Sequence, residues 1–85
     1  MNSGNISGIS TNQTLPGIGL LNNANSSIFS LVNSGNISGT TAGNPQQNGQ
    51  DGYGIFNSGV ISNVNNQGTI NAVGLYDASG IWNVG

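Results

Sequence analysis

The sequence predicts an all-β protein, more specifically a β-solenoid, from three observations. A short motif recurs along the chain, its residues alternate in polarity, and its copies fall 20 residues apart once a single loop is removed. The 85 residues are enough for one small domain, and a hydrophobic content of 34% is thin for a conventional core. Asn and Gly are abundant and are poor helix formers, so a helical bundle is not expected.

The recurring motif reads apolar-x-Asn-x-small-x-Ile. The sequence Asn-Ser-Gly-Asn-Ile-Ser-Gly occupies 2–8 and, unchanged, 33–39. Strict alternation is the period of a β-strand with one face directed inward. Gly and Asn share that inner face with the aliphatic residues, so we expect the backbone to bend there, between two short strands. The aliphatic positions are predicted to form one inner stack: Ile6, Leu20, Ile28, Leu31, Ile37, Ile55, Ile61, Val64, Ile70, Leu75 and Ile81.

The spacing of the motifs predicts the coil. Asn2 and Asn22 are 20 residues apart, as are Asn57 and Asp77. The interval from Asn22 to Asn57 also becomes about 20 if the turn-rich segment 40–53 is looped out. We therefore predict a single domain over 1–85, with about three and a half coils of about 20 residues and a side loop at 40–53.

Stacked coils would bring equivalent polar side chains into ladders. Successive coils lie roughly 4.8 Å apart, so an Asn amide can donate to one neighbouring coil and accept from the other. The two predicted ladders are Asn2, Asn22, Asn57 and Asp77, and Asn33 with Asn66.

The composition excludes most kinds of functional site. The chain has no Lys, Arg, His or Cys and only two acidic residues, Asp51 and Asp77. General bases, activated nucleophiles and zinc ligands are therefore lacking, so we expect neither an enzyme nor a cofactor. Nucleic-acid binding lacks the cations it requires, and no apolar run is long enough to cross a bilayer as a helix. A weakly bound ion at Asp51 is an alternative to a purely structural loop.

At two stretches the chain resembles bacterial autotransporter passengers and filamentous-haemagglutinin-type adhesins. These stretches are Gly54-Ile55-Phe56-Asn57-Ser58-Gly59-Val60-Ile61 and Val64-Asn65-Asn66-Gln67-Gly68-Thr69-Ile70, followed by a similar restart at Leu75-Tyr76-Asp77. The resemblance implies a right-handed parallel β-helix displayed outside the cell, with roles in adhesion and biofilm formation. Host or matrix glycans are the alternative partners, bound by aromatic side chains, whereas aromatic stacking between coils or scattered surface aromatics is the favoured interpretation of the same residues. Tyr53, Phe56, Tyr76, Trp82 and Phe29 are the aromatic candidates for stacking on sugars.

The ends of the chain carry the functional prediction. Both belong to the repeat, and no Lys residue is present to discourage edge pairing. We therefore expect a structural subunit that polymerises head to tail into an extracellular fibre, with the chain itself as its partner. The predicted polymerisation ends are Asn2, Gly4, Ile6, Ile81, Trp82 and Val84.

Several alternatives remain open at this point. The rival to the fibre is that the chain is a fragment of a large surface adhesin that mediates attachment or biofilm formation. A low-complexity linker would not keep Ile in register over 20 residues, whereas an amyloid-like segment shares the Asn ladders. Ice binding would need a regular Thr ladder, and the five Thr residues do not form one.

Overall fold

The computed structural model describes residues 1–11, 15–41, 51–75 and 77–84. This part of the chain contains strands and turns but no helix, which confirms the all-β prediction. In chain order the strands are β1 (Asn5–Ser10), β2 (Gly17–Asn22), β3 (Ser27–Ile28), β4 (Leu31–Asn33), β5 (Asn36–Thr41), β6 (Gly52–Asn57), β7 (Val60–Ile61), β8 (Val64–Asn66), β9 (Thr69–Val73) and β10 (Ala78–Asn83).

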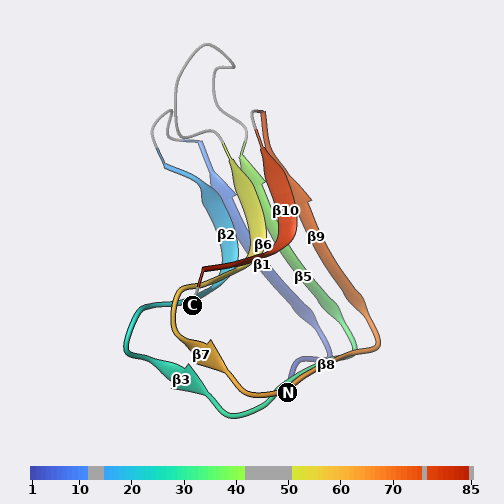
Figure 1. The fold of residues 1–85 in the computed structure, drawn as a ribbon. Helices are drawn as coiled ribbons and strands as arrows, with labels where there is room; N and C mark the ends of the chain where they lie inside the picture. Colours follow the sequence, from blue (N-terminus) through green and yellow to red (C-terminus); the bar gives the residue numbers. More distant parts are fainter. Residues whose placement is uncertain (12–14, 42–50, 76, 85) are drawn as a thin grey trace.

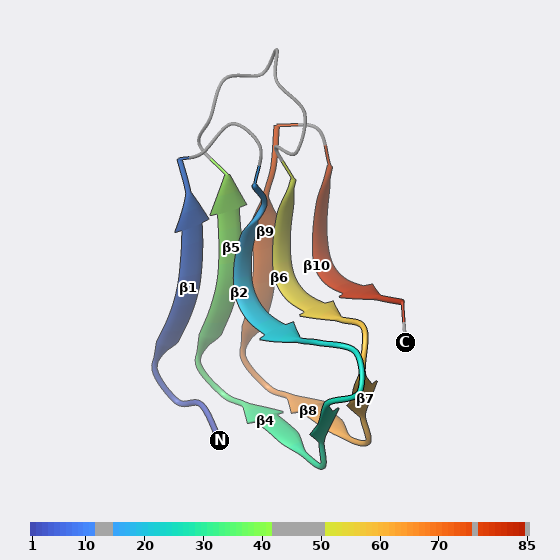
Figure 2. The same ribbon diagram turned by 90° about the vertical axis from the view of Figure 1, so that its left-hand side faces the viewer.

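Every strand pairing in the described residues is parallel. Two sheets have three strands each, in the orders β1-β5-β9 and β2-β6-β10, and face one another (Figure 1). Two short sheets, β3-β7 and β4-β8, lie beyond the diverging end of the large ones (Figure 2). Asn2 adds a single parallel bridge to Asn33 beside β4. Neighbouring strands of each large sheet are separated in the sequence by strands of the other sheets, and we call the stretch of chain from one strand to its neighbour a pass.

Alternation along the strands sets which residues face inward. Along β5, Ile37, Gly39 and Thr41 are buried, whereas the residues between them are only half-buried. The same alternation was the basis of the strand prediction. In β1 and β9 it recurs with greater exposure, because these strands form the edges of the sheet.

The strand registers contradict the predicted 20-residue period. Asn2 lies next to Asn33, 31 residues later, and Asn33 next to Asn66, a further 33. Along the large sheet β2-β6-β10, the corresponding intervals from Asn22 to Asn57 and from Asn57 to Asn83 are 35 and 26 residues. The two residues of the 20-residue spacing, Asn2 and Asn22, lie in different sheets, because the motif recurs at successive corners within one pass.

The predicted loop at 40–53 includes residues at both ends that belong to strands. Thr40 and Thr41 end β5, and Gly52 and Tyr53 begin β6, so all four residues are in strands. The rest of that predicted loop, residues 42–50, lies outside the described residues.

Glycines allow the two large sheets to approach closely at one end. A Cβ built on Gly39 would overlap the carbonyl oxygens of Tyr53 and Gly17, and one on Gly17 would overlap the Thr40 carbonyl oxygen. Backbone therefore packs directly on backbone there, which only Gly permits. The sheets diverge away from this contact (Figure 1), and larger apolar side chains pack between them.

The apolar core lies between the diverging sheets. Leu31, Ile37 and Ile55 are buried there. Five further members of the predicted inner stack pack against them: Ile6, Leu20, Ile28, Ile61 and Ile70. Val64 and Ile81 are in register with the core residues Leu31 and Ile55, as predicted, but they are 47% and 52% exposed. The prediction was wrong for Leu75, which is 43% exposed and lies outside the strands. Val64 and Ile81 lie on strands that have a partner on one side only.

The molecule is a thin slab, with extents of 38 × 27 × 14 Å. The short dimension matches three strands at about 4.8 Å spacing, the depth of each large sheet. None of the described residues forms a helix with the length and apolar character needed to cross a bilayer.

Candidate functional site: asparagine ladders and open sheet edges

The first asparagine ladder joins Asn2, Asn33 and Asn66. Asn2 Nδ2 donates to Asn33 Oδ1 at 2.8 Å, and Asn33 Nδ2 donates to Asn66 Oδ1 at the same distance. Asn33 is 1% exposed, so its amide needs partners within the protein. It finds two more acceptors in the carbonyl oxygens of Gly35 and Thr69, both at 3.2 Å.

The second ladder joins Asn22, Asn57 and Asn83. Asn22 Nδ2 donates to Asn57 Oδ1, and Asn57 Nδ2 donates to Asn83 Oδ1, both at 2.7 Å. Asn22 and Asn57 are buried. Asn22 Nδ2 also lies 3.1 Å from the carbonyl oxygen of Val60, so the side chain ties two passes of the chain together.

Local turn chemistry explains why Asn occupies these corners. The Asn57 side chain accepts from the Gly59 amide and donates to the Gly59 carbonyl oxygen, both at 3.2 Å. Asn2 makes the same pair of contacts with Gly4. A short amide side chain can thus satisfy the bend and still reach the next pass, which is typical of Asn in turns.

The ladder prediction was right for Asn33 with Asn66 and for Asn22 with Asn57, and wrong for Asn2 and Asp77. Asn2 bonds to Asn33 rather than to Asn22. Asp77 lies outside both ladders, and its backbone amide donates to Asp51 Oδ1.

Asn83, which the sequence analysis missed, occupies the place predicted for Asp77. It pairs with Asn57 across the sheet. The signal for this pairing is an aliphatic residue two positions before each Asn. The three matching segments are Leu20-Leu21-Asn22, Ile55-Phe56-Asn57 and Ile81-Trp82-Asn83.

Both ladders run in the same direction. In each, the amide of the earlier residue donates to the carbonyl oxygen of the later one. We call the edge formed by β1, β2 and Asn2 the N-terminal rim, and the edge formed by β8, β9 and β10 the C-terminal rim. The ladders therefore end in side-chain carbonyls at the N-terminal rim, on Asn2 and Asn22. They end in side-chain amides at the C-terminal rim, on Asn66 and Asn83.

The predicted polymerisation ends lie on these two rims. Asn2, Gly4 and Ile6 are at the N-terminal rim, where Gly4 is exposed and the other two are half-buried. Ile81, Trp82 and Val84 are exposed at the C-terminal rim. The backbone amide of Val84 donates to the Asn57 carbonyl oxygen at 2.8 Å, which holds the chain on the sheet just beyond β10.

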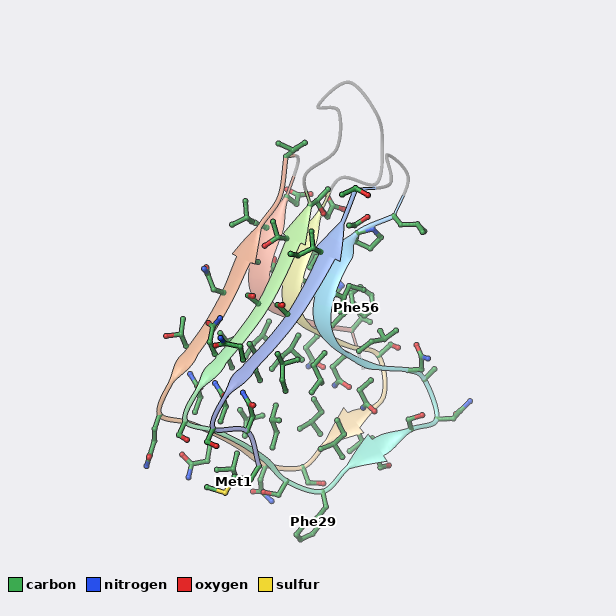
Figure 3. The ribbon with its side chains drawn as sticks, turned by 180° about the vertical axis from the view of Figure 1, so that it is seen from behind. Met1, Phe29 and Phe56 are labelled. Carbon is green, nitrogen blue, oxygen red and sulfur yellow. The ribbon has the colours of Figure 1, made fainter. Side chains whose placement is uncertain are left out.

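Three of the aromatic candidates cluster. The Tyr53 ring lies 5.2 Å from the Phe56 ring and 5.5 Å from the Trp82 ring, measured between centroids. Phe29 is 82% exposed and points away from the molecule, well apart from Phe56 (Figure 3). Tyr76 lies outside the described residues.

Asp51 connects this cluster to the neighbouring turn. Its Oδ2 accepts from the Tyr53 hydroxyl at 3.1 Å, and its Oδ1 accepts from the Asp77 amide at 3.1 Å. Burial raises the pKa of Tyr53 above 10.0, and the Asp51 hydrogen bond and the charges of Asp51 and Asp77 raise it further. The described residues contain no group of three or more His, Cys, Asp or Glu side chains that could hold a metal ion.

No protein-family model, curated protein or solved structure matches this chain. The ladders, the rims and the aromatic cluster are the features of the molecule that bear on its function.

Proposed function

We propose that this chain winds as a β-solenoid and that copies stack head to tail into a non-covalent fibre. The shared direction of the two asparagine ladders carries the proposal. Because one rim ends in amide donors and the other in carbonyl acceptors, the C-terminal rim of one copy complements the N-terminal rim of the next. Two like rims would instead oppose donor to donor or acceptor to acceptor.

The strand registers support the same arrangement. Ile6, Ile37 and Ile70 form one row across the first large sheet, and Leu21, Phe56 and Trp82 form one across the second. Continuing these rows would set Ile6 of the next copy on Ile70, and its Leu21 on Trp82. Both contacts would bury apolar surface that is exposed or half-buried in the single copy.

The free edges carry none of the charged residues that usually prevent edge pairing. Unpaired backbone groups on an edge strand are a template for another strand, and Lys is the common deterrent. This chain contains no Lys or Arg, and its only acidic residues, Asp51 and Asp77, lie outside β1, β2, β9 and β10. A junction between copies would therefore involve no charge repulsion along these edge strands.

The aromatic cluster favours a second candidate, a segment of a surface adhesin. The half-buried Phe56 ring and the exposed Trp82 ring both pack against the buried Tyr53, whose hydroxyl donates to the Asp51 carboxylate, and accessible aromatic faces suit stacking on sugars. In this alternative the partners are host or matrix glycans and the location is the cell surface. Quenching or a blue shift of Trp82 fluorescence by a panel of oligosaccharides would favour it over the fibre.

Two matched double variants test the fibre. Ile9, Thr40 and Val73 form a row on the outer side of the first large sheet, so a stacked copy would place its Ile9 beside Val73. Ile9 and Val73 are 69% and 51% exposed, so charges at these positions leave the monomer folded. Ile9→Lys with Val73→Lys puts like charges across each junction, whereas Ile9→Lys with Val73→Asp puts opposite charges there.

We expect the like-charged variant to raise the critical concentration for fibre formation about tenfold at low salt, and added salt to reverse the effect. The opposite-charged variant should assemble as readily as the wild type. Sedimentation and negative-stain microscopy measure both. Equal assembly of the two variants at low salt would contradict head-to-tail stacking in this register.

A further inference from the structure

A groove lies over the edge of the short strand β7, at the C-terminal rim. Two adjoining hollows form it and share Asn57, Ile61 and Asn83. Gly59, Val60, Val64 and Ile81 complete its walls. We call this feature the β7 groove. It exists because the β3-β7 sheet has two strands where the sheet β2-β6-β10 beside it has three.

The pairing of β7 on β3 shows what a strand at this place requires. The Val60 amide donates to the Ser26 carbonyl oxygen, and the Ser62 amide donates to the Ile28 carbonyl oxygen, both at 2.9 Å. Asn22 Nδ2 lies 3.1 Å from the Val60 carbonyl oxygen. The strand is thus held by two backbone bonds and one ladder asparagine, with Ile61 beside Ile28 in the core.

One pass later in the chain, the residues of the groove provide the same kinds of groups that hold β7 on β3. Asn57 stands in the place of Asn22, is 5% exposed, and lines both hollows. Its amide reaches Asn83 Oδ1 and the Gly59 carbonyl oxygen, but among the described residues it has no counterpart of the Val60 carbonyl. Alternate residues of a parallel strand bond to opposite sides, so the Ile61 amide and carbonyl point away from β3, into the groove.

The walls of the β7 groove select an uncharged, branched aliphatic strand. Ile61, Val64 and Ile81 supply its apolar surface. The charged residues, Asp51 and Asp77, do not line it, so a charged peptide would find no counter-charge there. On both β3 and β7 an Ile is followed three positions later by another aliphatic residue, as Ile28 by Leu31 and Ile61 by Val64.

We propose that the β7 groove is a strand-addition site for an extended peptide with the chemistry of β7 itself: uncharged, with an Ile and a second aliphatic residue three positions later. The peptide adds parallel to β7 and extends the β3-β7 sheet by one strand. Its amides donate to the Gly59 and Ile61 carbonyl oxygens, and one of its carbonyls accepts from Asn57 Nδ2. The proposal rests on the winding described under Proposed function, but it does not depend on fibre formation.

A peptide copied from residues 57–66, acetylated and amidated, tests the site. Fluorescence anisotropy follows the labelled peptide titrated with the 85-residue protein at concentrations where the protein is dispersed. We expect saturable binding. A peptide with Ser62→Pro lacks the amide that bonds to the Ile61 carbonyl, and we expect it to bind at least about tenfold more weakly.

Protein variants place the binding in the groove. Ile81→Asp puts a charge on the groove wall, and Val73→Asp puts the same charge on β9, away from it. Ile81 and Val73 are 52% and 51% exposed, so the two changes disturb the monomer to a similar extent. We expect Ile81→Asp to weaken peptide binding at least about tenfold and Val73→Asp to leave it unchanged.

Nuclear magnetic resonance identifies the contacts directly. On adding the peptide we expect the side-chain amide signals of Asn57 and the backbone amide signal of Ile61 to shift. Absence of saturable binding, equal binding of the Ser62→Pro peptide, or equal binding by the two protein variants would overturn the proposal. Peptide binding without fibres would refute only the fibre, and fibres without peptide binding would refute only the groove.

Discussion

Asn33 shows how a polar side chain can be buried in the interior of this molecule. It is almost wholly buried, and its four hydrogen-bond partners are Gly35 on its own pass, Asn2 on the pass before, and Asn66 and Thr69 on the pass after. Burying an amide side chain costs free energy unless it is hydrogen-bonded. The ladder supplies these hydrogen bonds in only one register of the strands, so it also fixes that register. A slip of one residue would leave every ladder asparagine without its partner.

Removing one inner asparagine should therefore destabilise the protein much more than removing an outer one. We expect Asn33→Ala to lower the free energy of unfolding by about 3 kcal/mol, because Asn2 and Asn66 lose their partner and a cavity remains. Asn66→Ala, at the exposed end of the same ladder, should cost less than about 1 kcal/mol. Urea denaturation measures both, and equal losses would contradict the ladder.

Tyr53 makes the stability of the folded protein decrease at alkaline pH. Burial and the Asp51 hydrogen bond raise its pKa above the ordinary value of 10.0, so the folded state favours the neutral phenol. This contribution to stability is fully present below about pH 10, and it is lost as the pH rises through the folded-state pKa. Tyr53→Phe should flatten the fall in unfolding free energy above about pH 10. Wild-type and variant curves that fall in parallel would exclude this role.

At the scale of the strands, glycine positions decide how closely the two large sheets approach. Gly39 faces the carbonyl oxygens of Tyr53 and Gly17, whereas a Cβ on Gly4 would meet nothing within 4 Å. We expect Gly39→Ala to destabilise the protein by more than about 3 kcal/mol, because two sheets must separate to admit one methyl group. Gly4→Ala should change stability by less than about 0.5 kcal/mol. Thermal unfolding of the two variants checks this contrast.

Alternation in the sequence was enough to predict strands and most of the core. Ile37 and Ile55, the two most buried aliphatic residues, were both predicted to face inward. Pairing could not be predicted in the same way, because the Asn-x-Gly turn recurs at different corners of one pass as well as between passes. The 20-residue spacing of Asn2 and Asn22 therefore relates two corners, not two stacked strands.

The pairing of Asn57 with Asn83 could not be predicted from a fixed period, because the connections between strands differ in length. Asn57 follows Asn22 by 35 residues, but Asn83 follows Asn57 by only 26. The difference arises mainly between the strands, because β5 and β6 are separated by residues 42–51 and β9 and β10 by 74–77. A fixed period therefore pointed to Asp77 instead of Asn83. The rims and the β7 groove appear only when both registers are known.

At the scale of the whole molecule, thinness is the property on which the proposed stacking of copies depends. A slab only 14 Å deep has two broad rims and little interior, so much of its apolar surface stays exposed. Ile9, Leu21, Val73, Ile81 and Trp82 are each at least 40% exposed along strands at the sheet edges. Stacking more layers covers such residues without requiring a new kind of contact.

Cryo-electron microscopy of the concentrated protein would show whether copies stack head to tail. Because each large sheet is three strands deep, continuous stacking predicts filaments in which each copy adds about 14 Å along the axis, with a 4.8 Å layer spacing and all copies pointing the same way. Particles that stay dispersed at about millimolar concentration, or filaments whose neighbouring copies point in opposite directions, would contradict it.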